Sequence, residues 1–326
     1  MQYLLVGNYG TGNFGDEALK EYFLSAFPEA KFQVLSAHPG EGELPRLPAG
    51  IRSFLLTRWW RTLAALRKSD GLVFGGGTLF TDIESVHACL LWWWHAFVCR
   101  VFRKPYFLAC QGIGPFRTRM GPPSLLRSFG GAGEWCARWV VARAAFVSVR
   151  DTASFQRVQL WRKSTNVIQT ADPVFSLFAA QKRDTSSQKL LVIIPRINSS
   201  NSFIERAGEL TKSDTWNEVC ILSLQPEDAR EQEVCRSLVH VLSLHASAIV
   251  PIRSVADLAA QVGRAELVLS QRYHGALAAL ALGVPLEAVA QGEGDKLSSV
   301  SEISSTAALA LVSSGERQLR SRLFPE

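Results

Sequence analysis

The stretch LVLSQRYHGALAALALG, residues 267–283, joins a short apolar run to an alanine-rich segment that ends in glycine. The apolar run predicts a buried strand over Leu267–Ser270, and the pattern after it predicts a helix over His274–Leu282. Small side chains on that helix permit close packing against a sheet. A strand that leads directly into a helix is typical of a parallel sheet with crossover helices.

The same alternation continues outward in both directions. Further strands are predicted at Gln2–Val6, Lys31–Leu35, Gly71–Phe74, Tyr106–Cys110, Ala145–Val149, Leu190–Ile194, Val219–Leu224, Ala248–Pro251 and Leu286–Ala290. Further helices are predicted at Asp16–Ala26, Trp59–Lys68, Val86–Phe102, Trp135–Arg143, Thr152–Leu160, Arg230–Leu242 and Val255–Arg264. A polar linker separates the halves at Ala179–Lys189. We therefore predict an α/β protein with two doubly wound, Rossmann-like domains, residues 1–180 and 188–326, that face a cleft.

The overall composition favours a cytoplasmic protein with an anionic small partner. The chain has 326 residues, of which 47% are hydrophobic and 20% are charged, and its formal net charge of +6 is dispersed along the sequence. The six cysteines lie far apart and never form the close pairs of zinc or redox sites, so we expect buried free thiols. No secretory signal is predicted, no metal site is expected, and nucleic-acid binding is disfavoured by the dispersed charge.

Two apolar segments raise the question of a membrane. Cys89–Phe102 is too short to span a bilayer and is interpreted as a buried or interfacial helix. Ile51–Lys68 mixes aromatic and aliphatic residues with arginines, as basic amphipathic helices on anionic membranes do. A packed helix with a solvated basic face is the commoner explanation, so peripheral contact at the inner face of a membrane stays one alternative.

The N-terminal stretch Gly7–Glu17 reads GNYGTGNFGDE and satisfies the GxGxxG spacing of dinucleotide-binding proteins. A nicotinamide dinucleotide also needs an acidic residue at the end of the second strand, and that strand ends in Leu35-Ser36-Ala37-His38. Asp16 and Glu17 would repel a phosphate at the helix start. We interpret the glycines as a rigid turn that faces a substrate and expect no bound cofactor.

Two further glycine-rich turns are predicted at strand ends. Asp70–Asp82 contains three successive glycines after a strand, and Gln111–Pro115 repeats the pattern. A backbone without side chains lets a ligand approach the carboxyl end of a strand. Arg150 follows another strand. Its side chain could form an ion pair with Asp151 or Asp172 or contact a ligand, and the sequence favours neither role. The candidate acceptor or cleft residues are Asn13, Asp16, Gly76, Gly77, Asp82, Gln111, Arg150 and Asp172.

The second half contains the stronger set of charged residues. Arg196 follows the strand Leu190–Ile194, while Ser270, Arg272 and His274 lie where the opening stretch passes from strand to helix. A fixed guanidinium beside an imidazole combines an anion ligand with a proton donor. Lys296, after the next strand, is a further candidate at the same sheet edge, although a surface lysine is an equal alternative.

Taken in chain order, these motifs resemble the polysaccharide pyruvyl transferase family. The matching features are the GNxGD-type opening, the GGG run, the GQGIGP-like turn, an arginine before a short helix, the DP step at Asp172-Pro173 and the terminal RxHG helix. They extend from Gly7 to Lys296. The resemblance implies a fold similar to the GT-B glycosyltransferases, phosphoenolpyruvate as donor substrate and a pyruvate ketal on a saccharide of a cell-wall or exopolysaccharide precursor.

Under that resemblance we assign provisional roles. His274 is the proposed acid and Arg272 the phosphate ligand, so these two are the candidate catalytic residues; Arg196, Ser270, Arg272 and Lys296 form the candidate donor site. The expected acceptor is a saccharide. The basic, tryptophan-rich segment Arg58–Lys68 suggests that this saccharide is lipid-linked. A glycosyltransferase with a nucleotide-sugar donor and a non-catalytic phosphosugar-binding protein remain the alternatives.

Overall fold

The computed structural model of the chain describes residues 1–48, 50–83, 85–116, 131–161, 167–184, 189–213, 215–292, 297–300 and 303–325. The chain divides into two compact units. The first contains residues 1–11, 19–173 and 310–326, and the second contains residues 12–18 and 174–309. This division differs from the predicted ranges in three segments: residues 12–18 and 174–180 group with the second unit, and residues 310–326 group with the first.

The first unit is built on a seven-stranded parallel sheet of order β3-β2-β1-β4-β5-β6-β7. Its strands are β1 (Gln2–Val6), β2 (Lys31–Ser36), β3 (Leu44–Pro45), β4 (Gly71–Phe80), β5 (Tyr106–Ile113), β6 (Phe146–Val149) and β7 (Val167–Gln169). The chain starts near the middle of the sheet and builds outward on both sides, which is the doubly wound arrangement. The central strands read as apolar runs because both of their faces are covered.

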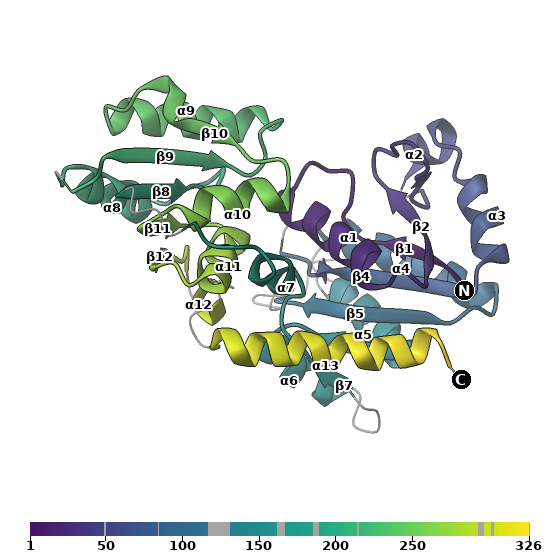
Figure 1. Cartoon of the computed structure of the whole chain (residues 1–326). Helices are drawn as coiled ribbons and strands as arrows, with labels where there is room; N and C mark the ends of the chain where they lie inside the picture. Colours follow the sequence, from purple (N-terminus) through teal and green to yellow (C-terminus); the bar gives the residue numbers. More distant parts are fainter. Residues whose placement is uncertain are drawn as a thin grey trace. The chain divides into compact units, whose positions relative to one another are not determined.

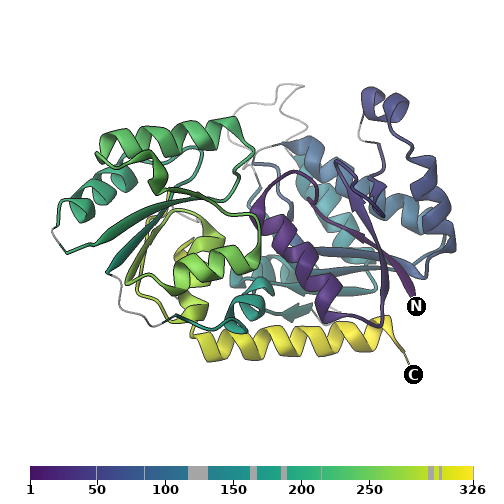
Figure 2. The ribbon, with the colours of Figure 1, turned by 45° about the horizontal axis from the view of Figure 1, so that its top comes forward.

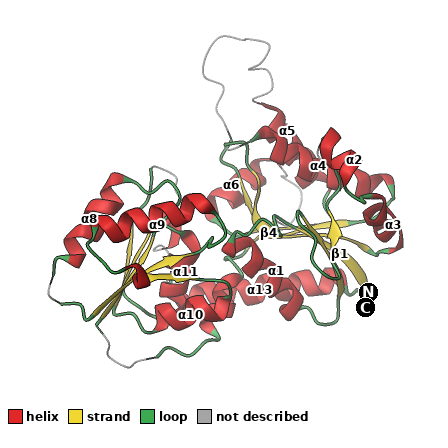
Figure 3. Cartoon of the chain, turned by 90° about the horizontal axis from the view of Figure 1, so that it is seen from above, coloured by secondary structure: helices red, strands yellow, loops and turns green. Residues whose placement is uncertain are grey.

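Helices cover both faces of this sheet. They are α1 (Phe14–Ala26), α2 (Ile51–Leu56), α3 (Trp60–Lys68), α4 (Val86–Val101), α5 (Ala132–Arg143), α6 (Thr152–Trp161) and α13 (Ser305–Leu323). Side chains of α3, α4, α5 and α6 share one apolar core with the sheet, while the part of α1 in this unit and α13 lie on the opposite face, as Figure 3 shows from above. The unit is therefore a three-layer sandwich.

The glycine run corrects one prediction. The three glycines were expected to form a turn, but β4 continues through them to Phe80, and β5 likewise continues to Ile113. The ladder between β4 and β5 shifts register between Gly77 and Phe80, and both Gly76 and Gly77 have positive φ, +77° and +83°. Glycine is needed there because other residues rarely adopt that conformation. The run is an irregular strand and not a loop.

The second unit contains a five-stranded parallel sheet of order β10-β9-β8-β11-β12. Its strands are β8 (Leu190–Ile194), β9 (Glu218–Ser223), β10 (Ile249–Pro251), β11 (Leu267–Ser270) and β12 (Leu286–Ala288). Its helices are α7 (Val174–Ala179), α8 (Asn201–Thr211), α9 (Ala229–Val241), α10 (Val255–Gly263), α11 (Tyr273–Leu282) and α12 (Leu297–Val300). Helices α8 and α9 pack on one face of the sheet, and α10 and α11 lie on the other, an arrangement visible in Figures 2 and 3.

The predicted α/β class, with two parallel sheets and alternating helices, is confirmed. Ile51–Lys68, interpreted as one amphipathic helix, is divided into α2 and α3 (Figure 1). Pattern reasoning did not find α7, α8, α12 and α13, or the short edge strands β3 and β7. All six cysteines are buried and free, as expected. Among the described residues, no helix combines the length and apolarity that a bilayer crossing requires.

Candidate functional site

The opening sequence stretch forms the centre of the candidate site. β11 ends at Ser270, and α11 begins at Tyr273 with Arg272 as its N-cap residue. The Ser270 hydroxyl is fully buried, donates to the Arg272 carbonyl at 2.8 Å and accepts from the Arg272 amide at 3.1 Å. Ser270 thus shapes the turn that presents Arg272, and its predicted contact with a donor stays a prediction.

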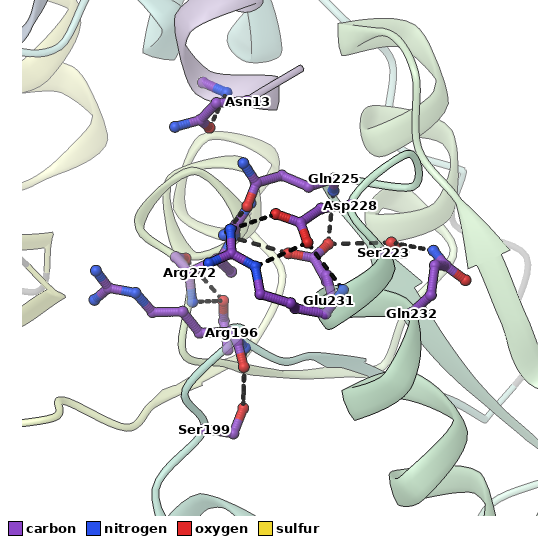
Figure 4. A network of polar contacts seen from close by, with 12 residues as sticks. Asn13, Arg196, Ser199, Ser223, Gln225, Asp228, Glu231, Gln232 and Arg272 are labelled. Carbon is purple, nitrogen blue, oxygen red and sulfur yellow. Dashed lines mark hydrogen bonds and ion pairs between the residues drawn. The ribbon is translucent and has the colours of Figure 1, made fainter. Parts of the chain in front are cut away.

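Arg272 is held by a buried polar network that includes a carboxylate absent from the predicted site. Its Nη1 donates to Gln225 Oε1 at 3.1 Å and lies 3.4 Å from Glu231 Oε2 (Figure 4). Glu231 is fully buried, and its Oε1 accepts from the Ser223 hydroxyl and from the Gln225 amide at 2.6 Å. Because both acceptors are fixed by α9 and the end of β9, the guanidinium has a defined position.

The environment of Arg272 is dominated by burial. Desolvation lowers the pKa of this guanidinium, Glu231 opposes that effect, and the positive charge of Arg196 adds to it. Arg196 follows β8, the strand beside β11, and its Nη1 donates to Gln291 Oε1 at 3.0 Å. The predicted pair of cations therefore lies at one edge of the second sheet, where an anion would relieve their mutual repulsion.

The start of α11 differs from its neighbours in its capping. Ser200, Asp228 and Ser254 cap α8, α9 and α10 with side-chain hydrogen bonds to backbone amides. At α11 the Arg272 side chain makes no such cap. A helix start without a side-chain cap, next to two arginines, is suited to an anion because its first N–H groups point outward.

His274 lies in the first turn of α11 against the start of α1. Its ring forms edge-to-face contacts with Phe14 and Tyr273, at centroid distances of 6.2 and 5.3 Å. A Cβ added to Gly15 would lie 2.1 Å from the His274 Cε1 atom. Gly15 is therefore needed for close approach of the imidazole to the backbone, although its own φ is an ordinary helical one.

The N-terminal glycine motif thus contributes to the same unit as the two arginines. Asn13 accepts a hydrogen bond from the Gly15 amide, and its carbonyl accepts from the amides of Asp16 and Glu17, which starts α1. Asp16 is near enough to Arg272 to favour its charged form. Figure 4 shows Asn13 on the side of α1 that faces the arginine network.

The first unit contains a buried ion pair between an arginine and a carboxylate. Arg150, after β6, forms an ion pair through Nη1 with Asp172, and its Nη2 donates to the Thr78 hydroxyl at 3.0 Å. Of the two partners left open by the sequence, Asp172 is the one found. The side chains of Arg150 and Asp172 are only 6% and 0% exposed, so this pair is part of the interior of the unit.

The other candidate residues of the first unit are also buried. Gln111 donates from Nε2 to the carbonyls of Phe74, Gly76 and Ala109, which ties β5 to the irregular part of β4. Asp82 is fully buried beside Gly133 in α5. Both residues belong to the first unit, and their predicted contact with an acceptor stays a prediction.

One candidate lies outside the described residues, namely Lys296. Three participants in the second-unit network were missed by sequence reasoning: Gln225, Glu231 and Gln291. Gln225 lies two residues after the strand end at Ser223 and Gln291 three residues after the strand end at Ala288, and that position was the available signal. Glu231 carried no such signal because it lies inside a helix whose other charged residues are mostly exposed.

Comparison with known sequences decides the family. The family model for polysaccharide pyruvyl transferase matches residues 13–290, which is most of the chain. The chain belongs to this family. The resemblance drawn from the motifs is thereby confirmed, and membership implies a transferase that modifies a polysaccharide. No curated protein sequence matches the chain at a significant level.

Solved structures confirm the GT-B-like fold of this pyruvyl transferase family member. HepE from Anabaena, in complex with UDP-glucose, has a TM-score of 0.54 at 12% identity and covers 99% of this chain and 95% of its own. The UDP-GlcNAc 2-epimerase from Methanocaldococcus jannaschii has a TM-score of 0.56 at 12% identity, with 98% and 99% coverage. MnaA from S. aureus, solved with UDP, has a TM-score of 0.56 at 11% identity, with 98% and 95% coverage. At this identity the similarity concerns the fold alone.

Proposed function

We propose that the protein transfers the enolpyruvyl group of phosphoenolpyruvate onto two hydroxyls of a saccharide, forming a pyruvate ketal on a cell-wall or exopolysaccharide precursor. The observation that carries the proposal is Arg272, fixed by Glu231 and Gln225 at a helix start without a side-chain cap. Family membership supports pyruvyl transfer, and the second-unit site supports a small anionic donor.

Phosphoenolpyruvate carries a phosphate and a carboxylate, so its site requires several fixed hydrogen-bond donors. Arg272 and Arg196 supply two guanidinium groups, and the first backbone amides of α11 supply neutral donors. Guanidinium groups bind phosphate oxygens through paired hydrogen bonds. We assign Arg272 to the phosphate and Arg196 to the same anionic donor.

The chemistry also requires a proton at carbon. Protonation of the methylene carbon makes the adjacent carbon electrophilic, and a sugar hydroxyl then attacks it. A second hydroxyl displaces phosphate, which leaves a methyl group and two new C–O bonds; of the two hydroxyl protons, one replaces the proton used by the acid and the other leaves with phosphate. His274, in the first turn of α11 next to Arg272, is the residue we assign as acid.

A phosphate-release assay tests this function. The protein is incubated with phosphoenolpyruvate and a panel of nitrophenyl and lipid-linked saccharides, together with Arg272→Ala and His274→Ala. Arg253→Ala is the matched control, because Arg253 is an exposed arginine of the same unit that pairs with Glu227. Release that depends on a saccharide and disappears in the two site variants alone supports the proposal; full activity of His274→Ala would remove the assigned acid.

A nucleotide-sugar donor is the second candidate, since two of the solved structures named above contain UDP-glucose or UDP. Ligand binding to the folded state raises the melting temperature in proportion to the logarithm of ligand concentration over Kd. We expect phosphoenolpyruvate to raise it and UDP to leave it unchanged. The opposite result would favour a glycosyltransferase, and binding of phosphoenolpyruvate without any phosphate release would favour a non-catalytic protein.

A further inference from the structure

The first unit carries an exposed surface that is both apolar and basic. We define the α2–α3 surface by the apolar residues Ile51, Phe54, Leu55, Leu56 and Trp60 and the basic residues Arg52, Arg58, Arg61, Arg67 and Lys68. Figures 1 and 2 show α2 away from the sheet of its own unit, at the end of the segment that follows β3. Neither the family nor the second-unit site assigns a role to this surface.

The apolar side chains of α2 are directed to solvent. Ile51 is 81% exposed, Phe54 53%, Leu55 71% and Leu56 72%, and Trp60 at the start of α3 is 56% exposed. None of the six residues of α2 is buried. A contiguous group of large apolar side chains on the surface of a protein marks a contact site, because exposing them to water is unfavourable.

The surface is mounted on a fixed base. Thr62 and Leu66 of α3 are buried, and Leu63 packs against the core of the first unit. Trp60, Arg61, Ala64, Arg67 and Lys68 are all exposed and, by helical periodicity, share the opposite face of α3. The Trp59 indole N–H donates to the Phe54 carbonyl at 3.0 Å, and the two rings lie 5.0 Å apart, which joins α2 to α3.

The charge of this segment has one sign. Between Glu43 and Asp70 the sequence contains arginines and a lysine but no acidic residue. Arg52, Arg58, Arg61, Arg67 and Lys68 are all exposed. Long basic side chains beside apolar ones are suited to a boundary at which phosphate headgroups meet hydrocarbon, because their stems stay in the apolar layer while their charges reach the headgroups.

We propose that the α2–α3 surface binds the surface of a bilayer rich in anionic lipid. A second copy of the chain is a poorer occupant, because a two-fold interface would place the same cations opposite one another. Nucleic acid would use the charges but not the aliphatic side chains of α2. Contact with a membrane would bring the enzyme to a lipid-linked saccharide, but the surface lies in the first unit and the binding does not depend on the identity of the donor.

Vesicle co-sedimentation without any substrate tests the proposal. One set of vesicles contains phosphatidylcholine alone, and in the other about a third of the lipid is phosphatidylglycerol, which gives the negative potential that attracts basic segments. We expect binding to the anionic vesicles only, and weaker binding as salt is raised. Equal binding to both sets, or to neither, overturns the proposal.

Two variants of the surface and two matched controls locate the binding. Leu55→Asp and the double variant Arg58→Gln/Arg61→Gln are each expected to weaken binding about tenfold or more. Leu160→Asp changes an equally exposed leucine of α6, and Arg236→Gln/Arg317→Gln removes two exposed arginines elsewhere; both are expected to bind as the unaltered protein does.

All six side chains altered in the test variants and controls are exposed, so near-UV spectra and melting temperatures should be unchanged. Sedimentation velocity in the absence of lipid tests whether a second copy of the chain binds the α2–α3 surface instead. A dimer that is lost in Leu55→Asp, with no binding to anionic vesicles, would show instead that the surface joins two copies of the chain.

Discussion

Each of the two units buries an arginine–carboxylate pair just after a strand, and the two pairs differ in how completely the arginine is used. Arg150 in the first unit contacts Asp172 through Nη1 and Thr78 through Nη2, and its side chain is 6% exposed. Arg272 in the second unit is 14% exposed and lies 3.4 Å from Glu231. In the described part of the chain, every recorded contact of its guanidinium is made by Nη1.

Under the proposed function, the difference gives the two pairs different roles. A guanidinium with partners on both terminal nitrogens ties elements together, here the ends of β4 and β6 to the segment after β7. A guanidinium anchored at one nitrogen keeps its remaining donors for an incoming anion. We therefore expect changes at Arg272 to affect activity and changes at the Arg150 pair to affect stability.

The largest effect is expected for Arg272→Ala. Removing the anchored guanidinium should lower kcat/KM for phosphoenolpyruvate about 10³-fold, the upper range for loss of one fixed donor in an active site. Arg272→Lys should recover only part of this loss because an ammonium group lacks the planar pair of donors. Steady-state kinetics of phosphate release measure both variants, and activity within a few-fold of normal in Arg272→Ala would contradict the comparison.

The second effect concerns the closed pair of the first unit. Asp172→Asn should lower the free energy of unfolding by about 3 kcal/mol, because it leaves the Arg150 charge buried without its counter-ion. Glu134→Gln is the matched control. It breaks the exposed pair with Arg138, at 57% and 38% side-chain exposure, and should change stability by less than about 1 kcal/mol. Denaturant titrations measure the free energy of unfolding of both variants. Equal losses in Asp172→Asn and Glu134→Gln would refute the claim that the buried Arg150–Asp172 pair stabilises the fold.

The third prediction tests the position of His274 without altering it. Gly15→Ala adds one methyl group at an ordinary helical position, where it meets the imidazole. Displacing the ring by about 1 Å is expected to lower kcat about 10²-fold with little change in far-UV spectra. Gly12→Ala is unsuitable as a control because Gly12 has a positive φ. The control is instead Ala18→Gly, a change of one methyl group in the same helix as Gly15. Retained activity in Gly15→Ala would mean that His274 acts from another position or not at all.

The smallest effect is expected for Glu231→Gln. This change preserves shape and the bonds from Ser223 and Gln225 but removes the negative charge beside Arg272. Arg272 keeps its bond to Gln225, so we expect KM for phosphoenolpyruvate to change about tenfold with a smaller loss of stability than in Asp172→Asn. A stability loss equal to that of Asp172→Asn, with KM unchanged, would make Glu231 a structural residue and remove the distinction between the two pairs.

The sequence predicted the strands well because parallel strands covered on both faces are continuous apolar runs. Gln2–Val6, Leu190–Ile194 and Leu267–Ser270 agree with the structure at both ends. The glycine run in β4 was mistaken for a turn, since positive φ values inside a strand are specified by pairing with β5 and not by local preference. The break between α2 and α3 was not predicted within Ile51–Lys68, where one continuous amphipathic helix was the interpretation.

For the site, the sequence predicted the residues at strand ends, Arg196 and Arg272, but not the residue that fixes Arg272. Glu231 lies on α9, far from Arg272 in the chain, and its burial follows only from the packing of that helix against β9. The place of Gly15 beside His274 was equally hidden, because it joins the start of the chain to α11. Contacts of this kind depend on tertiary structure and leave no local pattern.

The return of α13 to the first unit has a consequence for the order of events during synthesis. Tyr3 donates to the carbonyl of Leu323, and Arg320 donates to the carbonyl of Ala26, so the first strand and the first helix are completed by residues near the other end of the chain. These residues emerge from the ribosome only after the whole second unit has been made. The first unit therefore keeps an apolar face exposed while the second unit folds, and a chain that stops before residue 310 would contain all of the second unit's strands but lack the helix that completes the first unit.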